Sequence, residues 1–348
     1  MKMMQQMACA ALAAAFAVGV AGCGSKDYSK PKVADGTVAA IVVRPAENTS
    51  LAPLCKQYGL GMGELMKQVP DKDFQEVLKE LELDKAQYKW LAVTFSDVSP
   101  EKFEKGEPDF AVAVSTTLDL DNVIAVAEKY NKEQKNNEEI KKLTVAGVPA
   151  YEVVNTDKKK SEVFLAGLDK QLILIANTSA NLEKLVALYH DDKGASADFG
   201  SFTLGANDVI RLKVTKVGEN VKKALPSPDA LQMVNGFVPD GDKMILGMGA
   251  VELALAASGD GKNINLDLSL DMAADADADK LVTVAKTGLM ALTAQMKEGA
   301  EKDADSKAAY EALQAVKIEA KGKVATLTAS TAADAALKAL ADKAKELK

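Results

Sequence analysis

The sequence predicts an α+β fold, a mainly antiparallel sheet with helices packed on one face, arranged as two related modules of ββα-ββ-α order. Three observations lead to this prediction. Short β-branched and apolar runs recur along the 348 residues, separated by Gly, Pro, Asn and Asp. Segments with apolar residues at helical spacing follow these runs. Two apolar runs meet at Gly259-Asp260-Gly261, as strands do in a β-hairpin.

The first half of the chain alternates strands and helices. Its first run ends at Pro45, which cannot donate a hydrogen bond to a neighbouring strand. A later run, 172–175, is apolar at every position, so we expect that strand to be covered on both faces. The predicted strands are 37–44, 89–97, 109–116, 143–146, 150–154, 162–168 and 171–176. The predicted helices are 50–58, 62–69, 71–83, 121–134 and 178–190.

The second half begins after a Gly-, Ala- and Ser-rich stretch over 192–208. The run 262–272 alternates polar residues with leucine and isoleucine, which predicts a strand with one wet face and one covered face. Pro226 and Pro228 interrupt a helical segment that extends to about residue 238. The predicted strands are 209–214, 244–258, 262–272, 316–320 and 324–329. The other predicted helices are 275–296 and 332–347.

The two halves share an order of elements, which suggests an internal repeat. Residues 121–127 align with 279–285, and each segment follows a strand and opens a helix. The first half then has an extra hairpin, and the second half has a longer first helix. We therefore predict two modules, 37–207 and 208–348. The alternation resembles that of many uncharacterised bacterial envelope proteins with repeated strand-helix modules, and this resemblance carries over no catalytic residue.

The first 23 residues contain an export signal. Lys2 is the only charge before an apolar stretch from Met7 to Val20, which is too short to span a bilayer as a helix. The stretch ends in Val20-Ala21-Gly22-Cys23, an aliphatic residue and two small residues before a cysteine. This resembles the lipobox of bacterial lipoproteins. A cleaved soluble protein and a retained anchor are the alternatives.

The lipoprotein resemblance implies a signal peptide over 1–22, cleavage before Cys23 and lipidation of Cys23. The anchor then holds the protein on a membrane of the cell envelope. Gly24 and Ser25 follow the cysteine, whereas an Asp directly after it usually marks inner-membrane retention, so the resemblance favours the outer membrane. Residues 23–36 are polar and without periodicity, and we expect them to form a short lipidated tether.

Charge and cysteine content exclude several classes of protein. The net charge is −7 with both signs interspersed, and only 5% of residues are aromatic, so we expect no nucleic-acid partner. After loss of the signal and lipidation of Cys23, Cys55 is the only free thiol. The mature fold therefore has no intramolecular disulfide, and Cys55 is expected to be a small buried apolar residue.

The sequence contains no motif that assigns a catalytic, cofactor or metal site. His190, the only histidine, is expected at a helix C-terminus, where a cation is favourable. The string Gly59, Gly61, Gly63 follows a helix rather than a strand, so it is no dinucleotide fingerprint. The lysines at 158–160 are expected in a solvated hairpin turn, with a lipid headgroup or an acidic partner as the alternative.

One acidic cluster invites a calcium interpretation. Asp275, Asp277 and Asp279 occupy alternate positions, like the first ligands of a calcium loop. Position six of such a loop would be Lys280 instead of glycine, and position twelve would be Lys286 instead of glutamate. We therefore expect these aspartates to stabilise a helix N-terminus, and we expect no metal.

Three classes of function remain. The first is a non-catalytic envelope lipoprotein that binds or supports an envelope protein or a glycan, and it should present an exposed patch. The second is a carboxylate-based hydrolase, which should bring carboxylates with shifted pKa values into a cleft. The third is a lipid or lipoprotein carrier, which should contain an apolar cavity. The first class is the one that we favour.

Overall fold

A computed structural model describes most of the chain from Tyr28 onward. It covers residues 28, 30–60, 76–77, 79–82, 86–98, 101–102, 108–133, 137–199, 202–224, 231, 234–236, 238–300 and 304–346. The predicted signal peptide 1–22, the predicted lipobox and Cys23 lie outside the described residues. So do the predicted helix 62–69 and the first part of the predicted helix 71–83.

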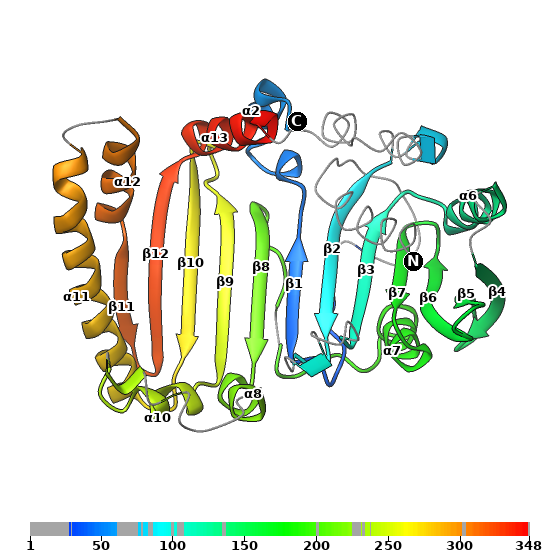
Figure 1. The fold of residues 1–348 in the computed structure, drawn as a ribbon, viewed down its shortest axis with the longest axis horizontal. Helices are drawn as coiled ribbons and strands as arrows, with labels where there is room; N and C mark the ends of the chain where they lie inside the picture. Colours follow the sequence, from blue (N-terminus) through cyan, green and yellow to red (C-terminus); the bar gives the residue numbers. More distant parts are fainter. Residues whose placement is uncertain are drawn as a thin grey trace.

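The described strands form one antiparallel sheet, which confirms the α+β prediction (Figure 1). Twelve strands lie in the order β11-β12-β10-β9-β8-β1-β2-β3-β7-β6-β5-β4. Their bounds are β1 Ala39–Val43, β2 Tyr88–Phe95, β3 Phe110–Thr116, β4 Glu138–Val145, β5 Val148–Asn155, β6 Lys160–Leu168, β7 Leu172–Ala176, β8 Asp208–Thr215, β9 Ala250–Ala257, β10 Asn263–Asp271, β11 Lys317–Lys321 and β12 Val324–Ala332.

Helices flank this sheet at both sides and at both strand ends (Figure 1). In the figure, α2 and α13 lie along the upper strand ends of the second half, and α8 and α10 lie along the lower ones. Among the described helices, none is long and apolar enough to cross a membrane. Their bounds are η1 Ala46–Asn48, α2 Ala52–Tyr58, α6 Leu120–Glu133, α7 Ser179–His190, α8 Val217–Ala224, α10 Gly241–Leu246, α11 Asp275–Ala300, α12 Ala304–Gln314 and α13 Ala333–Glu346.

The strand orders of the two halves match. In the first half the order β1-β2-β3-β7-β6 has α6 between β3 and β4 and α7 after β7. In the second half the order β8-β9-β10-β12-β11 has α11 after β10 and α13 after β12. The hairpin β4–β5 is the extra element of the first half. Because β1 and β8 pair antiparallel, the two halves continue as one sheet.

Both faces of the sheet are covered in the first half. The apolar cluster on one face includes Ile124 of α6 with Leu91 and Val112, and the cluster on the other includes Leu182 of α7 with Ala92 and Ala113. The helices of the first half therefore lie on two faces, not on one as predicted. The sequence of β7 explains this difference, because its five residues are apolar and all are buried.

The second half covers its two faces differently. Helix α11 packs on the same face as α6, where Val282 contacts a cluster with Ile318 and Ala325. Helix α13 lies against the strand ends, where Leu337 packs with Leu51 and Cys55. Among the described helices, none covers in the second half the face that α7 covers in the first half. The side chains on this face of the second half are accordingly polar, and include Arg211, Lys213, Glu252, Asn265, Asp267, Ser269, Thr326 and Thr328.

The edge strands carry charge instead of an apolar pattern. Strand β4 begins Glu-Glu-Ile-Lys-Lys and is mostly exposed, and β11 reads Lys-Ile-Glu-Ala-Lys. Charged residues on an edge strand oppose pairing with another chain. The pattern also explains why sequence reasoning found only 143–146 of β4, since an edge strand needs no buried face.

The predicted hairpin forms, with a glycine at its turn. Gly261 has φ +69°, and a Cβ on it would lie 2.3 Å from the carbonyl oxygen of Ser50. The Ser50 hydroxyl also donates to the carbonyl of Ser258 at 2.6 Å. The turn therefore holds the segment before α2 close to the second half. The predicted strand 244–258 is shorter than expected, because α10 extends to Leu246 and β9 begins at Ala250.

The expected tether 23–36 is folded against the body from Tyr28 onward. Tyr28, Val33 and Ala34 are buried in the cluster that α7 covers. The Lys32 amide donates to the Tyr189 hydroxyl at 2.8 Å, and the Lys32 ammonium pairs with Asp192 at 2.7 Å. The spacing of apolar residues over 28–34 is too irregular to predict a helix or a strand. This segment packs on the sheet without regular structure, so only 23–27 remain for a tether.

Candidate functional site

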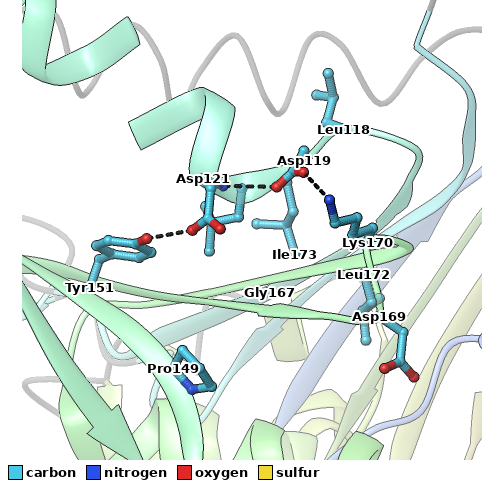
Figure 2. Close-up of a pocket in the computed structure, with 11 residues that line it drawn as sticks. Leu118, Asp119, Asp121, Pro149, Tyr151, Gly167, Asp169, Lys170, Leu172 and Ile173 are labelled. Atoms are coloured by element: carbon cyan, nitrogen blue, oxygen red, sulfur yellow. Dashed lines mark hydrogen bonds and ion pairs between the residues drawn. The ribbon is translucent and has the colours of Figure 1, made fainter. Parts of the chain in front are cut away.

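A pocket of about 190 Å³ lies where α6 begins, beside the β6–β7 turn (Figure 2). Asp119 and Asp121 stand at the start of α6, Tyr151 comes from β5, and Lys170 comes from the turn. Apolar side chains, among them Leu172 and Ile173, form the rest of the lining. Three carboxylates, those of Asp119, Asp121 and Asp169, line this cleft, as a carboxylate-based hydrolase would need.

Each polar group of the pocket already has a partner. The Lys170 ammonium lies 2.8 Å from Asp119, and the Tyr151 hydroxyl donates to Asp121. Asp119 also accepts from the backbone N–H of Asp121 at 3.1 Å, which caps the first turn of α6. Outside the cleft's centre, Asp169 accepts from the Tyr28 hydroxyl at 3.1 Å. These bonds fix a helix start and two loops in place.

Three groups of the pocket, Asp119, Tyr151 and Lys170, have pKa values shifted further from pH 7. The hydrogen bond from Lys170 lowers the pKa of Asp119, and the same bond raises the pKa of Lys170. The bond to Asp121, with burial, raises the pKa of Tyr151 to about 12. At neutral pH these three groups therefore keep one protonation state. A general acid or base needs a pKa near the working pH, so the pocket is suited to structural support and not to proton transfer.

A second feature is an apolar part of the sheet that the described helices leave uncovered. Register places its side chains on one face: Ile41 lies opposite Leu212, Leu212 opposite Leu253, and Leu253 opposite Leu268. We call this surface the open apolar face. It consists of Ile41 on β1, Leu212 and Val214 on β8, Val251, Leu253 and Leu255 on β9, and Leu266 and Leu268 on β10.

The open apolar face continues the covered parts of the same sheet face. Ile41 lies opposite Val93 of the cluster under α6, and Leu268 lies opposite Leu327 of the cluster under α11. Val93 is buried, whereas all eight side chains of the open apolar face are only half-buried. None of the eight belongs to the four apolar clusters of the described residues.

The opposite face of the same strands holds a polar pocket of about 270 Å³. The Arg211 guanidinium donates to Glu252 at 2.6 Å and to the carbonyl of Thr203 at 2.9 Å. The Lys213 ammonium lies 5.7 Å from the centre of the Phe199 ring. These contacts attach Phe199 and Thr203 to β8, and they join β8 to β9. The two faces therefore differ sharply, since one is apolar and open and the other is polar and internally paired.

The residues that the sequence singled out lie apart from both features. His190 ends α7 and its ring nitrogen Nδ1 lies 2.8 Å from Asp191, in keeping with a helix C-terminus. Asp275 and Asp277 lie in the first turn of α11. The lysines 158–159 lie in the β5–β6 turn and Lys160 begins β6. Within the described residues, no group of three or more His, Cys, Asp or Glu could hold a metal ion.

Cys55 is a free cysteine, 2% exposed, in the cluster between α2 and α13. Burial raises the pKa of its thiol to about 11, and the charge of Glu47 adds to this rise. The thiolate is the reactive form, so at pH 8 about one thousandth of the thiol is reactive. We expect a chromogenic disulfide reagent at pH 8 to modify Cys55 slowly in the native protein and at once in denaturant. Rapid modification of the native protein would contradict this expectation.

Sequence reasoning missed the residues of both features. The aspartates at 119 and 121 just before a helix were a visible capping signal, but nothing in the sequence placed Tyr151 and Lys170 beside them. The apolar positions of β9 and β10 were visible as an alternating pattern. The sequence did not indicate whether a helix covers them.

No protein-family model, curated protein or solved structure matches this chain.

Proposed function

We propose that the protein is a lipid-anchored lipoprotein of the bacterial cell envelope, on the outer membrane, that binds a partner protein without catalysing a reaction. The observation that carries this proposal is the open apolar face, with eight half-buried aliphatic side chains on four adjacent strands. A contiguous apolar patch of this kind marks an interaction site in a folded protein. The lipobox Val20-Ala21-Gly22-Cys23 supports the anchor.

The described carboxylates favour binding over hydrolysis. Every described carboxyl group with a shifted pKa has it lowered, as for Asp119, Asp192, Asp240 and Asp260. A hydrolase that uses two carboxylates needs one with a raised pKa, to act as the acid. The hydrolase alternative therefore has less support than a binding function.

The partner that fits the open apolar face is an amphipathic helix. The same sheet face takes α6 on one side of the open part and α11 on the other, so a helix is its usual complement in this molecule. Four strands at about 4.8 Å spacing leave a width of about 19 Å, and eight-residue strands are about 26 Å long. A helix about 10 Å in diameter and about 17 residues long would fit that area.

A photo-crosslinking amino acid on β10 tests this proposal. Leu268 belongs to the open apolar face, and its neighbour Asp267 points to the polar face of the same strand. We expect a crosslinker at 268, activated in intact cells, to yield an adduct whose peptide comes from an amphipathic helix of another envelope protein. A crosslinker at 267 is the matched control, and we expect no such adduct there.

The other occupants are distinguishable by the mass of the adduct. A lipid adduct at 268 would mean that the protein carries a lipid and does not bind a partner protein through this face. An adduct with a second copy of the chain would make the open apolar face a dimer interface. A glycan adduct, no adduct, or equal adducts at 267 and 268 would contradict the proposal for this face.

A further inference from the structure

Tyr28 fastens the start of the described chain to one end of the strands. Its side chain is 3% exposed, and its carbonyl accepts from the Trp90 indole at 3.0 Å and from the Ser115 hydroxyl at 3.4 Å. Its hydroxyl donates to Asp169 in the β6–β7 turn at 3.1 Å. Trp90 lies near the start of β2 and Ser115 near the end of β3. Tyr28 thus joins three elements at the same strand end.

Only four residues lie between Cys23 and this attachment point, so the two are five Cα-to-Cα steps apart. A fully extended chain of five residues spans at most about 18 Å. The lipid on Cys23 is therefore held close to the β6–β7 turn and cannot reach the other end of the sheet. Strand β6 alone, with nine residues, separates its two turns by about 30 Å.

We infer that the strand end marked by Tyr28 and the β6–β7 turn faces the lipid surface of the anchoring membrane. This inference rests on the lipid anchor of the proposed function. The strands then stand away from the bilayer, and both faces of the sheet remain open to the side. The open apolar face is consequently presented beside the membrane and not pressed against it.

The chemistry of the same strand end in the second half fits a lipid surface. The paired residues Leu91, Val43, Ile210 and Leu255 mark the same strand end on β2, β1, β8 and β9. Helices α2 and α13 lie at this strand end in the second half (Figure 1). On α13, Leu337 is buried, whereas Leu340 is 56% exposed. Lys338 lies on the exposed part of the same helix. The exposed part of α13 thus carries an apolar and a cationic side chain, as helices that rest on headgroups do.

Two lysines at the ends of β6 provide a matched test. Lys170 lies in the β6–β7 turn and Lys159 in the β5–β6 turn, both exposed and both with φ near +50°. Each would be replaced by cysteine in the full chain, expressed in a Gram-negative bacterium, and labelled with a fluorescent maleimide. The buried Cys55 stays in both variants. The lipidated proteins are then placed in phosphatidylethanolamine–phosphatidylglycerol vesicles that contain a headgroup-linked nitroxide quencher.

We expect quenching at position 170 to exceed quenching at position 159 several-fold. Equal quenching, or stronger quenching at 159, would overturn the orientation while leaving the anchor intact. Intact mass of the protein in the vesicles reports the anchor separately. A mass without acyl chains on Cys23 would overturn the anchor and the orientation together. Adding Cys23→Ala to each variant should abolish quenching at both positions, because the lipid is what brings the body to the bilayer.

Discussion

Replacement of Cys23 by alanine should abolish incorporation of labelled fatty acid and release the protein from the membrane fraction. The physical reason is that acyl chains supply the binding energy, at about 0.8 kcal/mol per buried CH₂ group. One chain binds only marginally and two or more bind stably, so loss of all of them leaves no comparable attachment. Metabolic labelling and membrane fractionation measure both effects.

The matched control for Cys23→Ala is Cys55→Ala. Cys55 is buried between α2 and α13, where no acyl transfer can reach it in the folded protein. We expect this variant to take up label and to fractionate like the unchanged protein. Label retained by Cys23→Ala, with a normal share of the protein in the membrane fraction, would refute the lipobox interpretation.

The order and type of most elements were predictable because their signals are local. In 262–272, alternation of polar and apolar residues predicted a strand with one wet face, and β10 spans Asn263–Asp271. Asn265, Asp267 and Ser269 do lie on the polar face of the sheet. The turn at Gly259-Asp260-Gly261 required residues with unusual backbone freedom, and such residues are rare enough to be recognised.

Elements without an amphipathic signal were harder to predict. The start of β4 carries charge at most positions because this strand is the edge of the sheet. Helix α12 is polar and alanine-rich, so no strong apolar stripe marks it in the sequence. The segment after Tyr28 packs through irregular contacts, so its polar composition resembled that of a free tether. In each case the missing information was the position of a neighbour far away in the chain.

The candidate site shows the same limit more clearly. Strands β2 and β9 are both rich in apolar residues, yet Leu91 and Val93 are buried whereas Leu253 and Leu255 are half-buried. The difference arises because α11 packs over β11 and β12, and no described helix covers the open apolar face on β8 to β10. A strand with alternating polar and apolar residues has the same sequence pattern whether a helix or solvent covers its apolar face. Sequence therefore indicates which side chains share a face, and the tertiary structure decides which of them stay open.

Replacement of Trp90 by alanine should cause the largest loss of stability among single changes in the body. Trp90 is 1% exposed and stacks on Tyr189, with ring centres 6.0 Å apart. Its indole N–H also donates to the carbonyl of Tyr28. Loss of a buried aromatic ring leaves a cavity, and the free energy of unfolding should fall by about 3–5 kcal/mol. Denaturant unfolding of the Cys23→Ala protein, which needs no detergent, measures this change.

Trp90→Phe separates the ring from its hydrogen bond. Phenylalanine keeps an aromatic ring beside Tyr189 but cannot donate to Tyr28, whose carbonyl still accepts from Ser115. We expect this variant to lose clearly less stability than Trp90→Ala, since part of the apolar contact remains. In the lipidated protein, Trp90→Phe should also loosen Tyr28 and reduce the contrast in quenching between positions 170 and 159. A Trp90→Ala protein that loses less than about 1 kcal/mol would mean that the ring is not part of the packed core.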